Sequence, residues 1–386
     1  MPWKETFVMD ERVGFIAACL GGEETMTELC RRFAISRKTG YKWLERYRQG
    51  GPGALAERSH AARTYPQAIS EEVVGLLLAA RMRHPTWGPR KLLAWLAVRH
   101  ERTHWPAAST VGDLLSRKGL VIARHRRHRA TAGEPLVGVN GVNETWCADF
   151  KGWFLTGDSQ RCDPLTISDA HSRYLLRCHC VAKTDTEHVR GVFEACFREH
   201  GLPLRIRTDN GPPFATIGLG GLSRLSVWWV RLGILLERIE PGHPEQNGRH
   251  ERMHLTLKQE TAHPPAATLR AQQRSFDDWR KEYNNERPHE ALGQRPPAEF
   301  YAPSPRSFPL GLEEIHYPDD WQTRSVRGGG QMKWGGQDVA VTHALQGERI
   351  GLEPIDDGLW RVHFAHLALG LFDERKLKVR RLKKGE

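Results

Sequence analysis

A short segment that ends in Asp209 constrains the fold more than any other part of the chain. The run Leu204–Arg207 alternates apolar and basic residues and predicts a β-strand, and the Asn-Gly-Pro-Pro after Asp209 forces the chain to turn. An acidic residue at the end of a buried strand directs its carboxylate toward a cleft at the sheet edge. One carboxylate is a weak site, so the question is which others join it.

The charge of the chain narrows the class of partner. Its 386 residues suggest two to four structural units, and its formal net charge of +11 favours a polyanionic partner, with nucleic acid as the first candidate. A basic protein that is merely soluble is the alternative.

The seven cysteines are scattered, without paired CxxC spacing, which indicates a reducing compartment and argues against a disulfide scaffold or a zinc site. Cys178 and Cys180 would share one face of a strand and His179 the other, so core packing is favoured over metal binding. No signal core and no apolar run of transmembrane length is present. We therefore expect a soluble, cytoplasmic, nucleoid-associated bacterial protein with no membrane partner.

Residues 1–52 predict a helix-turn-helix DNA-binding domain. A short helix, the turn Ala34–Ser36 and a third helix that opens with basic residues have the order of that motif, in which the start of the last helix reaches base edges. An ordinary three-helix bundle is the alternative. The candidate DNA-contacting residues are Ser36, Arg37, Lys38, Thr39 and Lys42.

The same reasoning predicts a second helix-turn-helix domain over residues 69–122, with Ala108–Thr110 capping its last helix, 111–118. Basic linkers at 53–68 and 123–142 flank this domain and are candidates to follow a phosphate backbone, although plain solvated linkers fit them too. The candidate DNA-contacting residues of these segments are Ser109, Thr110, Arg117, Arg58, Arg124, Arg126, Arg127 and Arg129.

The central region, 143–302, predicts an α/β domain with a mixed sheet and helices around it. The predicted strands are 145–153, 165–169, 174–181, the run ending at Asp209, and 234–239, and the predicted helices are 184–200, 222–232 and 244–262.

Two further carboxylates are candidates to join Asp209. Asp149 lies on the first predicted strand of this region, and Glu251 lies on its last helix. Glu260 would face away from Glu251 at about 100° per residue, so Glu251 is the better candidate. His254 and Lys258 share the face of Glu251 and are predicted to hold DNA phosphates.

Three carboxylates from separate elements, without a cysteine or histidine cluster, suit Mg²⁺ or Mn²⁺. Two such ions per site can clamp the attacking and leaving oxygens of a phosphodiester displacement. Asp163 and Asp169 are rivals for the second ligand position, and we interpret Asp169 as structural or close to the site.

These motifs resemble a known family. Asp149 in Trp-Cys-Ala-Asp-Phe, Asp209 in Thr-Asp-Asn-Gly-Pro-Pro-Phe and Glu251 in His-Pro-Glu-Gln-Asn-Gly-Arg-His-Glu-Arg are similar to the DDE triad of retroviral-type integrases and insertion-sequence transposases. The tag Tyr-Asn-Asn-Glu-Arg-Pro-His-Glu-Ala-Leu-Gly at 283–293 looks like the end of that core. The closest likeness is to insertion-sequence family 481, and it covers nearly the whole chain.

The resemblance implies an RNase H-like catalytic core over 143–302, with Asp149, Asp209 and Glu251 as catalytic metal ligands. It implies hydrolysis at the ends of the element to free 3′-hydroxyls, and their transfer into target DNA by transesterification, by a dimer or tetramer on the DNA. The interval from Asp209 to Glu251 is longer than the retroviral pattern, and a Gly-rich insertion at 216–224 accounts for the excess.

Residues 310–386 contain short predicted strands with Gly-rich turns and predict a small β-barrel with a basic tail. The tail suggests contact with DNA or another subunit, or else a disordered solubilising segment. Two alternatives to the transposase remain for the chain: a DNA-binding repressor with an inactive RNase H-like core, and a metal-dependent nuclease without strand transfer.

Overall fold

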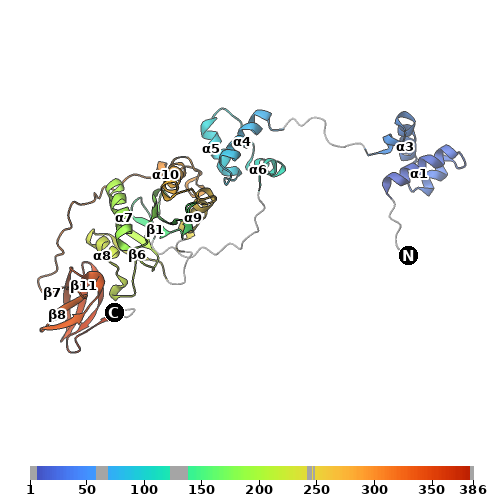
Figure 1. Ribbon diagram of the computed structural model, residues 1–386. Coiled ribbons are helices and arrows are strands. Elements are labelled where there is room, and N and C mark those ends of the chain that lie inside the picture. The colour runs from blue at the N-terminus through green and yellow to red at the C-terminus, as the bar shows by residue number, and fades with distance from the viewer. Residues whose placement is uncertain (1–6, 58–67, 122–137, 241–245, 247, 383–386) are drawn as a thin grey trace. The chain divides into compact units, whose positions relative to one another are not determined.

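The computed structural model describes residues 7–57, 68–121, 138–240, 246 and 248–382 (Figure 1). The chain divides into two compact units, Met1–Ala68 and Ile69–Glu386. Each is described by itself.

The first unit is a three-helix bundle of α1 (Val8–Gly21), α2 (Met26–Arg32) and α3 (Arg37–Gly50), followed by the short helix η1 (Pro52–Leu55). A capping box at Thr25 begins α2, and Ser36 caps α3 by accepting a hydrogen bond from the Thr39 main-chain N–H. Phe15 and Trp43 are buried at its centre. The predicted helix, turn and helix are therefore present.

The second unit begins with another three-helix bundle, formed by α4 (Glu71–Arg83), α5 (Pro89–Arg99) and α6 (Ala108–Arg117). Trp87 and Leu92 are fully buried in its core. The predicted cap of α6 is wrong: the helix already begins at Ala108, and the N-cap residue Ala107 offers no side-chain acceptor. Ser109 and Thr110 therefore lie inside the first turn.

A six-stranded mixed sheet forms the centre of the second unit. The strands are β1 (Thr145–Phe150), β2 (Phe154–Leu155), β3 (Arg161–Asp169), β4 (Leu175–Val181), β5 (Arg205–Thr208) and β6 (Leu235–Arg238). β3 pairs antiparallel with β1, β2 and β4, while β5 lies parallel to β1 and β6 parallel to β5. This arrangement confirms the predicted α/β, RNase H-like mixed sheet.

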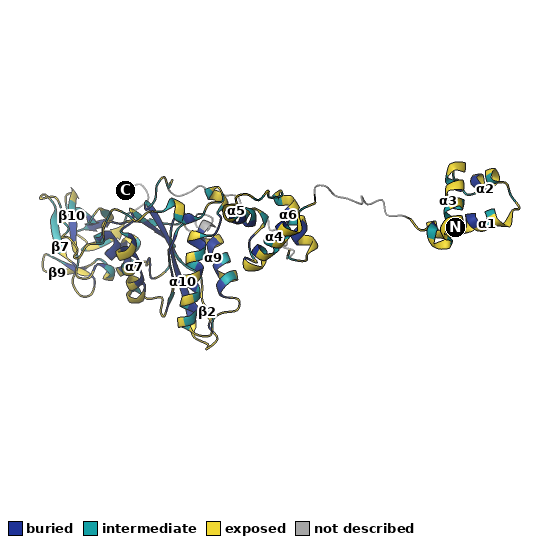
Figure 2. Cartoon of the chain, turned by 90° about the horizontal axis from the view of Figure 1, so that it is seen from above, coloured by how far each residue is buried: buried dark blue, intermediate teal, exposed yellow. Residues whose placement is uncertain are grey.

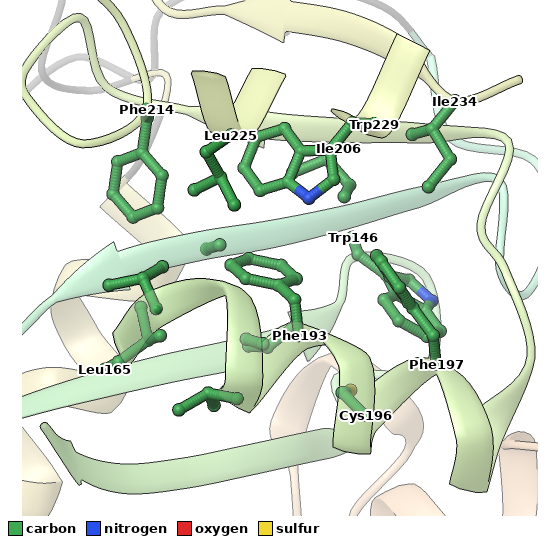
Figure 3. Close-up of a cluster of buried hydrophobic side chains, with 14 of the residues drawn as sticks. Trp146, Leu165, Phe193, Cys196, Phe197, Ile206, Phe214, Leu225, Trp229 and Ile234 are labelled. Atoms are coloured by element: carbon green, nitrogen blue, oxygen red, sulfur yellow. The ribbon is translucent and has the colours of Figure 1, made fainter. Parts of the chain in front are cut away.

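Helices cover both faces of the sheet. α7 (Thr186–His200) and α8 (Arg224–Arg231) pack on one face, where Phe193 and Phe197 meet Trp146 of β1 (Figure 3). α9 (Gly248–Thr261) and α10 (Leu269–Asn285) pack on the other face through Leu257 and Phe276. Of the strands between these layers, β1, β3, β4 and β5 are buried along most of their length (Figure 2).

One boundary of these helices differs from the prediction. The helix predicted from residue 184 begins at Thr186, and Asp185 caps it, since the Asp185 carboxylate accepts a hydrogen bond from the His188 N–H. The described part of the last predicted helix begins at Gly248, and residues 241–245 and 247 lie outside the described residues.

Helix α10 was not predicted, and it protects the edge strand β4. The Asn284 side chain accepts from the Leu175 N–H at 2.8 Å and donates to the Leu175 carbonyl at 2.9 Å. Gln273 bonds in the same way to the Cys180 N–H and the Cys178 carbonyl. Edge strands carry unpaired main-chain groups, so these amides satisfy groups that would otherwise be free to pair with another chain. The tag residue Asn284 thus has a structural task.

The C-terminal region contains two antiparallel sheets over one hydrophobic core, where the sequence predicted a small β-barrel. One sheet has the order β13-β12-β11-β10-β7 and the other is the hairpin β8-β9. The strands are β7 (Gln322–Ser325), β8 (Gln331–Trp334), β9 (Gln337–Ala340), β10 (Arg349–Asp356), β11 (Leu359–Phe364), β12 (Leu367–Asp373) and β13 (Lys378–Arg381). A wholly disordered basic tail is excluded, because Lys378–Arg381 pairs with β12.

The Gly-rich insertion before Glu251 is where the C-terminal sheets meet the core domain. Leu219 and Leu222 of the insertion belong to the same hydrophobic cluster as Leu369 and Phe372 of β12. Arg381 of β13 donates to the Ile217 carbonyl. The longer interval between Asp209 and Glu251 therefore has a physical reason, since the extra residues form a docking surface for the C-terminal sheets.

Candidate active site

Asp149 and Asp209 are carried by neighbouring parallel strands. β1 and β5 pair from Thr145 with Arg205 to Cys147 with Arg207, and each aspartate follows two residues after the last pair. Side chains alternate along a strand, so each aspartate shares a face with the last paired residue of its own strand. The two carboxylates thus project from the same face of the sheet, at the same position along the two strands.

The turn after Asp209 is held by local hydrogen bonds. One Asp209 carboxylate oxygen accepts from the Gly211 N–H at 3.2 Å, and the Asn210 side chain donates to the Ile239 carbonyl at 2.7 Å. Phe214 then enters the core under α8. The predicted strand followed by a turn is confirmed, and these bonds fix the direction in which Asp209 leaves β5.

Glu251 lies in the first turn of α9, and its side chain is exposed. His250, Met253, His254 and Leu257 are buried against the sheet, which leaves Glu251 and Lys258 on the exposed flank of the helix. The three predicted carboxylates therefore come from three elements on one side of the domain.

Carboxylate oxygens are the ligands that hard divalent cations take, so the donor chemistry of the triad fits Mg²⁺. Among the residues that the structure describes, however, no three His, Cys, Asp or Glu side chains lie close enough together to hold an ion. The elements bring the triad to one region, and the side chains are not gathered around one point.

His254 is placed differently from the predicted phosphate contact. It is only 6% exposed, and its Nε2 lies 2.7 Å from the Thr166 hydroxyl of β3, while its Nδ1 lies 4.0 Å from an Asp149 carboxylate oxygen. His250 also lies against Thr166, with Nε2 at 2.6 Å. Burial lowers the pKa of His250 to about 4 and, with His250 and Lys151 nearby, the pKa of His254 to about 2. Both rings are neutral near pH 7 and point into the protein.

Lys151 belongs to this region and was missed. Burial, reinforced by the positive charge of Lys258, lowers the pKa of Lys151, and the Asp149 carboxylate opposes the shift. Lys151 thus lies close enough to interact electrostatically with both Asp149 and Lys258. The signal was available in the sequence, because Lys151 follows Asp149 by two positions and a strand places such residues on one face.

The rival acidic residues have other partners. Asp169 is 1% exposed and accepts hydrogen bonds from the Asn143 N–H and from both the N–H and the hydroxyl of Ser172. Asp163 pairs with Arg161 at 2.6 Å. These contacts agree with a structural role for Asp169. Asp163 forms an ion pair with a residue of its own strand.

In the first helical unit, the predicted groove residues lie at the start of α3. Arg37, Lys38 and Lys42 are exposed. The Ser36 and Thr39 hydroxyls lie 2.9 Å apart within the cap. Among the predicted groove residues, Arg37, Lys38 and Lys42 are therefore the exposed cations that can reach DNA phosphates or bases.

The other predicted DNA-contacting residues form two groups, those that the structure describes and those that lie outside the described residues. Ser109, Thr110 and Arg117 are exposed on α6, and Lys258 is exposed on α9. Arg58, Arg124, Arg126, Arg127 and Arg129 lie outside the described residues. Within the described part of the chain, no helix is both long and apolar enough to cross a membrane.

Models of known families match residues 11–115, 139–297 and 321–380. Two models described as integrase core domain match residues 139–244 and 232–297. A helix-turn-helix domain model matches 11–63, and a homeodomain-like model matches 39–115. The model described as the IS481 family transposase C-terminal domain matches 321–380.

Among curated proteins, the chain is 28% identical over 287 residues to an IS476 insertion-element protein of Xanthomonas euvesicatoria, covering 72% of this chain and 79% of the relative. It is 27% identical over 240 residues to an IS407 insertion-element protein of Burkholderia multivorans, covering 61% and 83%.

Among solved structures, the HTLV-2 integrase catalytic core in complex with magnesium has a TM-score of 0.33 at 15% identity, over 44% of this chain and 100% of that chain. The simian T-cell lymphotropic virus intasome has a TM-score of 0.38 at 15% identity, over 80% and 99%.

The mixed sheet, the helix-turn-helix matches and the integrase-core matches support a protein of the integrase-core, polynucleotidyl transferase type. The family model that matches residues 321–380, in the C-terminal sheets, points to one group within this class. Together these matches support an IS481-type DDE transposase.

Proposed function

We propose that this protein is an active transposase that binds the ends of its element, hydrolyses a phosphodiester there to free a 3′-hydroxyl, and joins that hydroxyl to target DNA. The observation that carries the proposal is the placement of Asp149 and Asp209 at the same level of two neighbouring parallel strands, with Glu251 on the helix that covers that face. A buried pair of strands gives the two carboxylates fixed directions, as a preorganised site requires.

Asp149, Asp209 and Glu251 would hold the divalent metal, Mg²⁺ or Mn²⁺, with two ions per site. When bound, such ions polarise the phosphate and lower the pKa of the attacking water. Because the three side chains are not gathered in the described residues, we expect Glu251 to approach the aspartates when metal and DNA bind.

The cationic residues of the site have a separate task. Lys151 interacts electrostatically with both Asp149 and Lys258, and the two lysines would bind phosphates next to the reacting one, which orients the scissile bond. The exposed cations of α3, Arg37, Lys38 and Lys42, would read the end of the element in a major groove. A dimer or tetramer on the DNA would bring two ends together.

The proposal is tested with the full chain and a duplex that carries the DNA flanking the gene. Nicking in Mg²⁺, its loss in EDTA and its loss in Asp149→Asn are expected. Asp278→Asn is the matched control, because that carboxylate lies on α10 and its side chain is 81% exposed. A protein that shifts the duplex but never nicks it is a repressor, and one that nicks without joining strands is a nuclease; either result overturns the proposal.

A further inference from the structure

We propose that Thr166 is a positioning residue of the active site, which holds His250 and His254 on either side of Glu251 and so fixes the helix of Glu251 against the strand of Asp149. This inference rests on the function proposed above. It assigns a task to three buried polar residues that the triad itself does not use.

Thr166 lies directly opposite Asp149 in the antiparallel ladder of β1 and β3. Residues opposite each other in such a ladder share a face, so the Thr166 hydroxyl stands beside the Asp149 carboxylate. The same hydroxyl donates to the Asp149 main-chain carbonyl at 3.2 Å. Whatever binds Thr166 is therefore bound next to Asp149.

The hydrogen-bond capacity of Thr166 is fully used. A hydroxyl has one proton and two lone pairs, and we assign the proton to the Asp149 carbonyl, which can only accept, so that the lone pairs face the Nε2 atoms of His250 at 2.6 Å and His254 at 2.7 Å. Both imidazoles must then donate from Nε2, which makes Nδ1 the acceptor nitrogen of each ring. The Ser168 hydroxyl, 3.3 Å from His250 Nδ1, completes the set as a donor.

The spacing of the two histidines allows their contacts with Thr166 to set the direction of the Glu251 side chain. His250 and His254 are one helical turn apart and point at one atom, so they set both the rotation of α9 about its axis and its height along β3. Glu251 lies between them in the chain, and its direction follows from that rotation. Apolar packing by Met253 and Leu257 holds the helix to the domain but makes no directional bond to β3.

The alternative is that these groups are only a satisfied polar patch in the core. The two roles differ in what removal of the hydroxyl does. A packing role predicts a loss of stability alone, whereas a positioning role predicts weaker use of Mg²⁺ by protein that is folded and still binds DNA. Loss of a group that orients metal ligands typically costs about 10- to 100-fold in metal affinity or activity.

The test uses the full chain with Thr166→Val, which has the same shape without the hydroxyl, Thr166→Ser, which keeps the hydroxyl, and Thr145→Val as the control. Thr145 lies on β1, is equally buried, and its hydroxyl has no hydrogen-bond partner among the described residues. The readouts are the Mg²⁺ concentration for half-maximal nicking, the maximal nicking rate, DNA affinity and the thermal midpoint.

We expect Thr166→Val to raise the half-maximal Mg²⁺ concentration about tenfold or more with DNA affinity unchanged, Thr166→Ser to rescue most of that loss, and Thr145→Val to match the wild type. A Thr166→Val protein with wild-type Mg²⁺ dependence overturns the inference, as does a loss of nicking that only follows the unfolded fraction.

A second measurement is independent of activity. Nitrogen-15 NMR of the wild-type imidazoles, assigned by the signals lost in His250→Gln and His254→Gln, should show both rings protonated at Nε2. An Nδ1–H form of either ring overturns the inference even if nicking is observed. Wild-type protein that never nicks DNA contradicts the proposed function, whereas the NMR result then still decides whether the Thr166 contacts exist.

Discussion

Nη1 of Arg287 lies 2.9 Å from both carboxylate oxygens of Glu260, in a pair whose side chains are only 8% and 15% exposed. Trp279 Nε1 adds a third hydrogen bond to Glu260 at 2.6 Å. Glu260 and Glu251 lie on the same helix, yet Glu260 is bound by α10 and the residues after it while Glu251 is exposed. The two glutamates of α9 therefore have different surroundings: Glu260 is held in a buried ion pair, and Glu251 is exposed, as its proposed metal role requires.

Exchange of each glutamate for glutamine should separate these roles. Glu260→Gln should lower the free energy of unfolding by about 3 kcal/mol, because it leaves the Arg287 charge buried without its partner. Glu251→Gln should leave stability nearly unchanged and abolish Mg²⁺-dependent nicking. Urea unfolding followed by tryptophan fluorescence, beside the nicking assay, checks both. Equal stability of the two variants would show that the Glu260 pair contributes nothing.

The docking of the C-terminal sheets on the Gly-rich insertion should depend on Gly220. Its φ is +62°, and a Cβ there would lie 2.8 Å from Leu369 Cδ2. Gly220→Ala should therefore destabilise the protein by about 1–3 kcal/mol through backbone strain and overpacking.

The matched control is Gly75→Ala in the interior of α4, where a Cβ would meet no atom within 4 Å. Alanine is the better helix former, so this variant should gain about 0.5–1 kcal/mol. Differential scanning calorimetry measures both. The docking account is wrong if Gly220→Ala is as stable as Gly75→Ala.

Stability should fall as the pH is lowered from 7 to 5. Burial lowers the pKa of His200 to about 4, with Arg177 and Arg280 acting in the same direction and Glu199 opposing them, and burial lowers the pKa of His289 to about 3. The unfolded chain then binds more protons than the folded chain below about pH 6.5, the ordinary histidine pKa, so stability falls there with decreasing pH.

Thermal midpoints at pH 7 and pH 5 measure this dependence. His200→Gln, which has no titrating ring, should flatten the slope. A slope that His200→Gln does not alter would contradict the assignment.

The cations at the start of α3 should set part of the salt dependence of DNA binding. If Lys38 and Lys42 each neutralise one phosphate, Lys38→Ala and Lys42→Ala should each reduce the slope of log affinity against log salt by about 1. Lys281→Ala on α10, equally exposed, serves as the control. Fluorescence anisotropy over a salt series measures the slopes, and unchanged slopes in both α3 variants would exclude these contacts.

The sequence predicted the elements of the core well where a local signal was strong. The strand before Asp209 and the helix that carries Glu251 both have clear patterns, and both are present. It missed α10, although Phe276, Trp279 and Tyr283 recur at helical spacing and are buried. The amide contacts of Gln273 and Asn284 with the edge strand could not be predicted from that spacing. Strand β13 was missed because its basic residues resemble a solvated tail.

The candidate site was predicted in part. The triad residues were identified from motifs, but their separation depends on side-chain placement that no motif encodes. The sequence placed His254 on the face of Glu251, which suggested a phosphate contact. Its burial follows from the partner Thr166 on β3, and a pairing between distant segments is visible only in three dimensions.

Strand transfer tests the central claim most directly. The full chain, Mg²⁺ and a pre-cleaved end duplex with a free 3′-hydroxyl are incubated with supercoiled target plasmid. The account predicts a covalent joint between that 3′ end and a target 5′-phosphate, absent in Asp209→Asn and present in Asp278→Asn, with no DNA covalently attached to protein. Joining by Asp209→Asn at the wild-type rate, or no joining by a wild-type protein that binds the duplex, would contradict it.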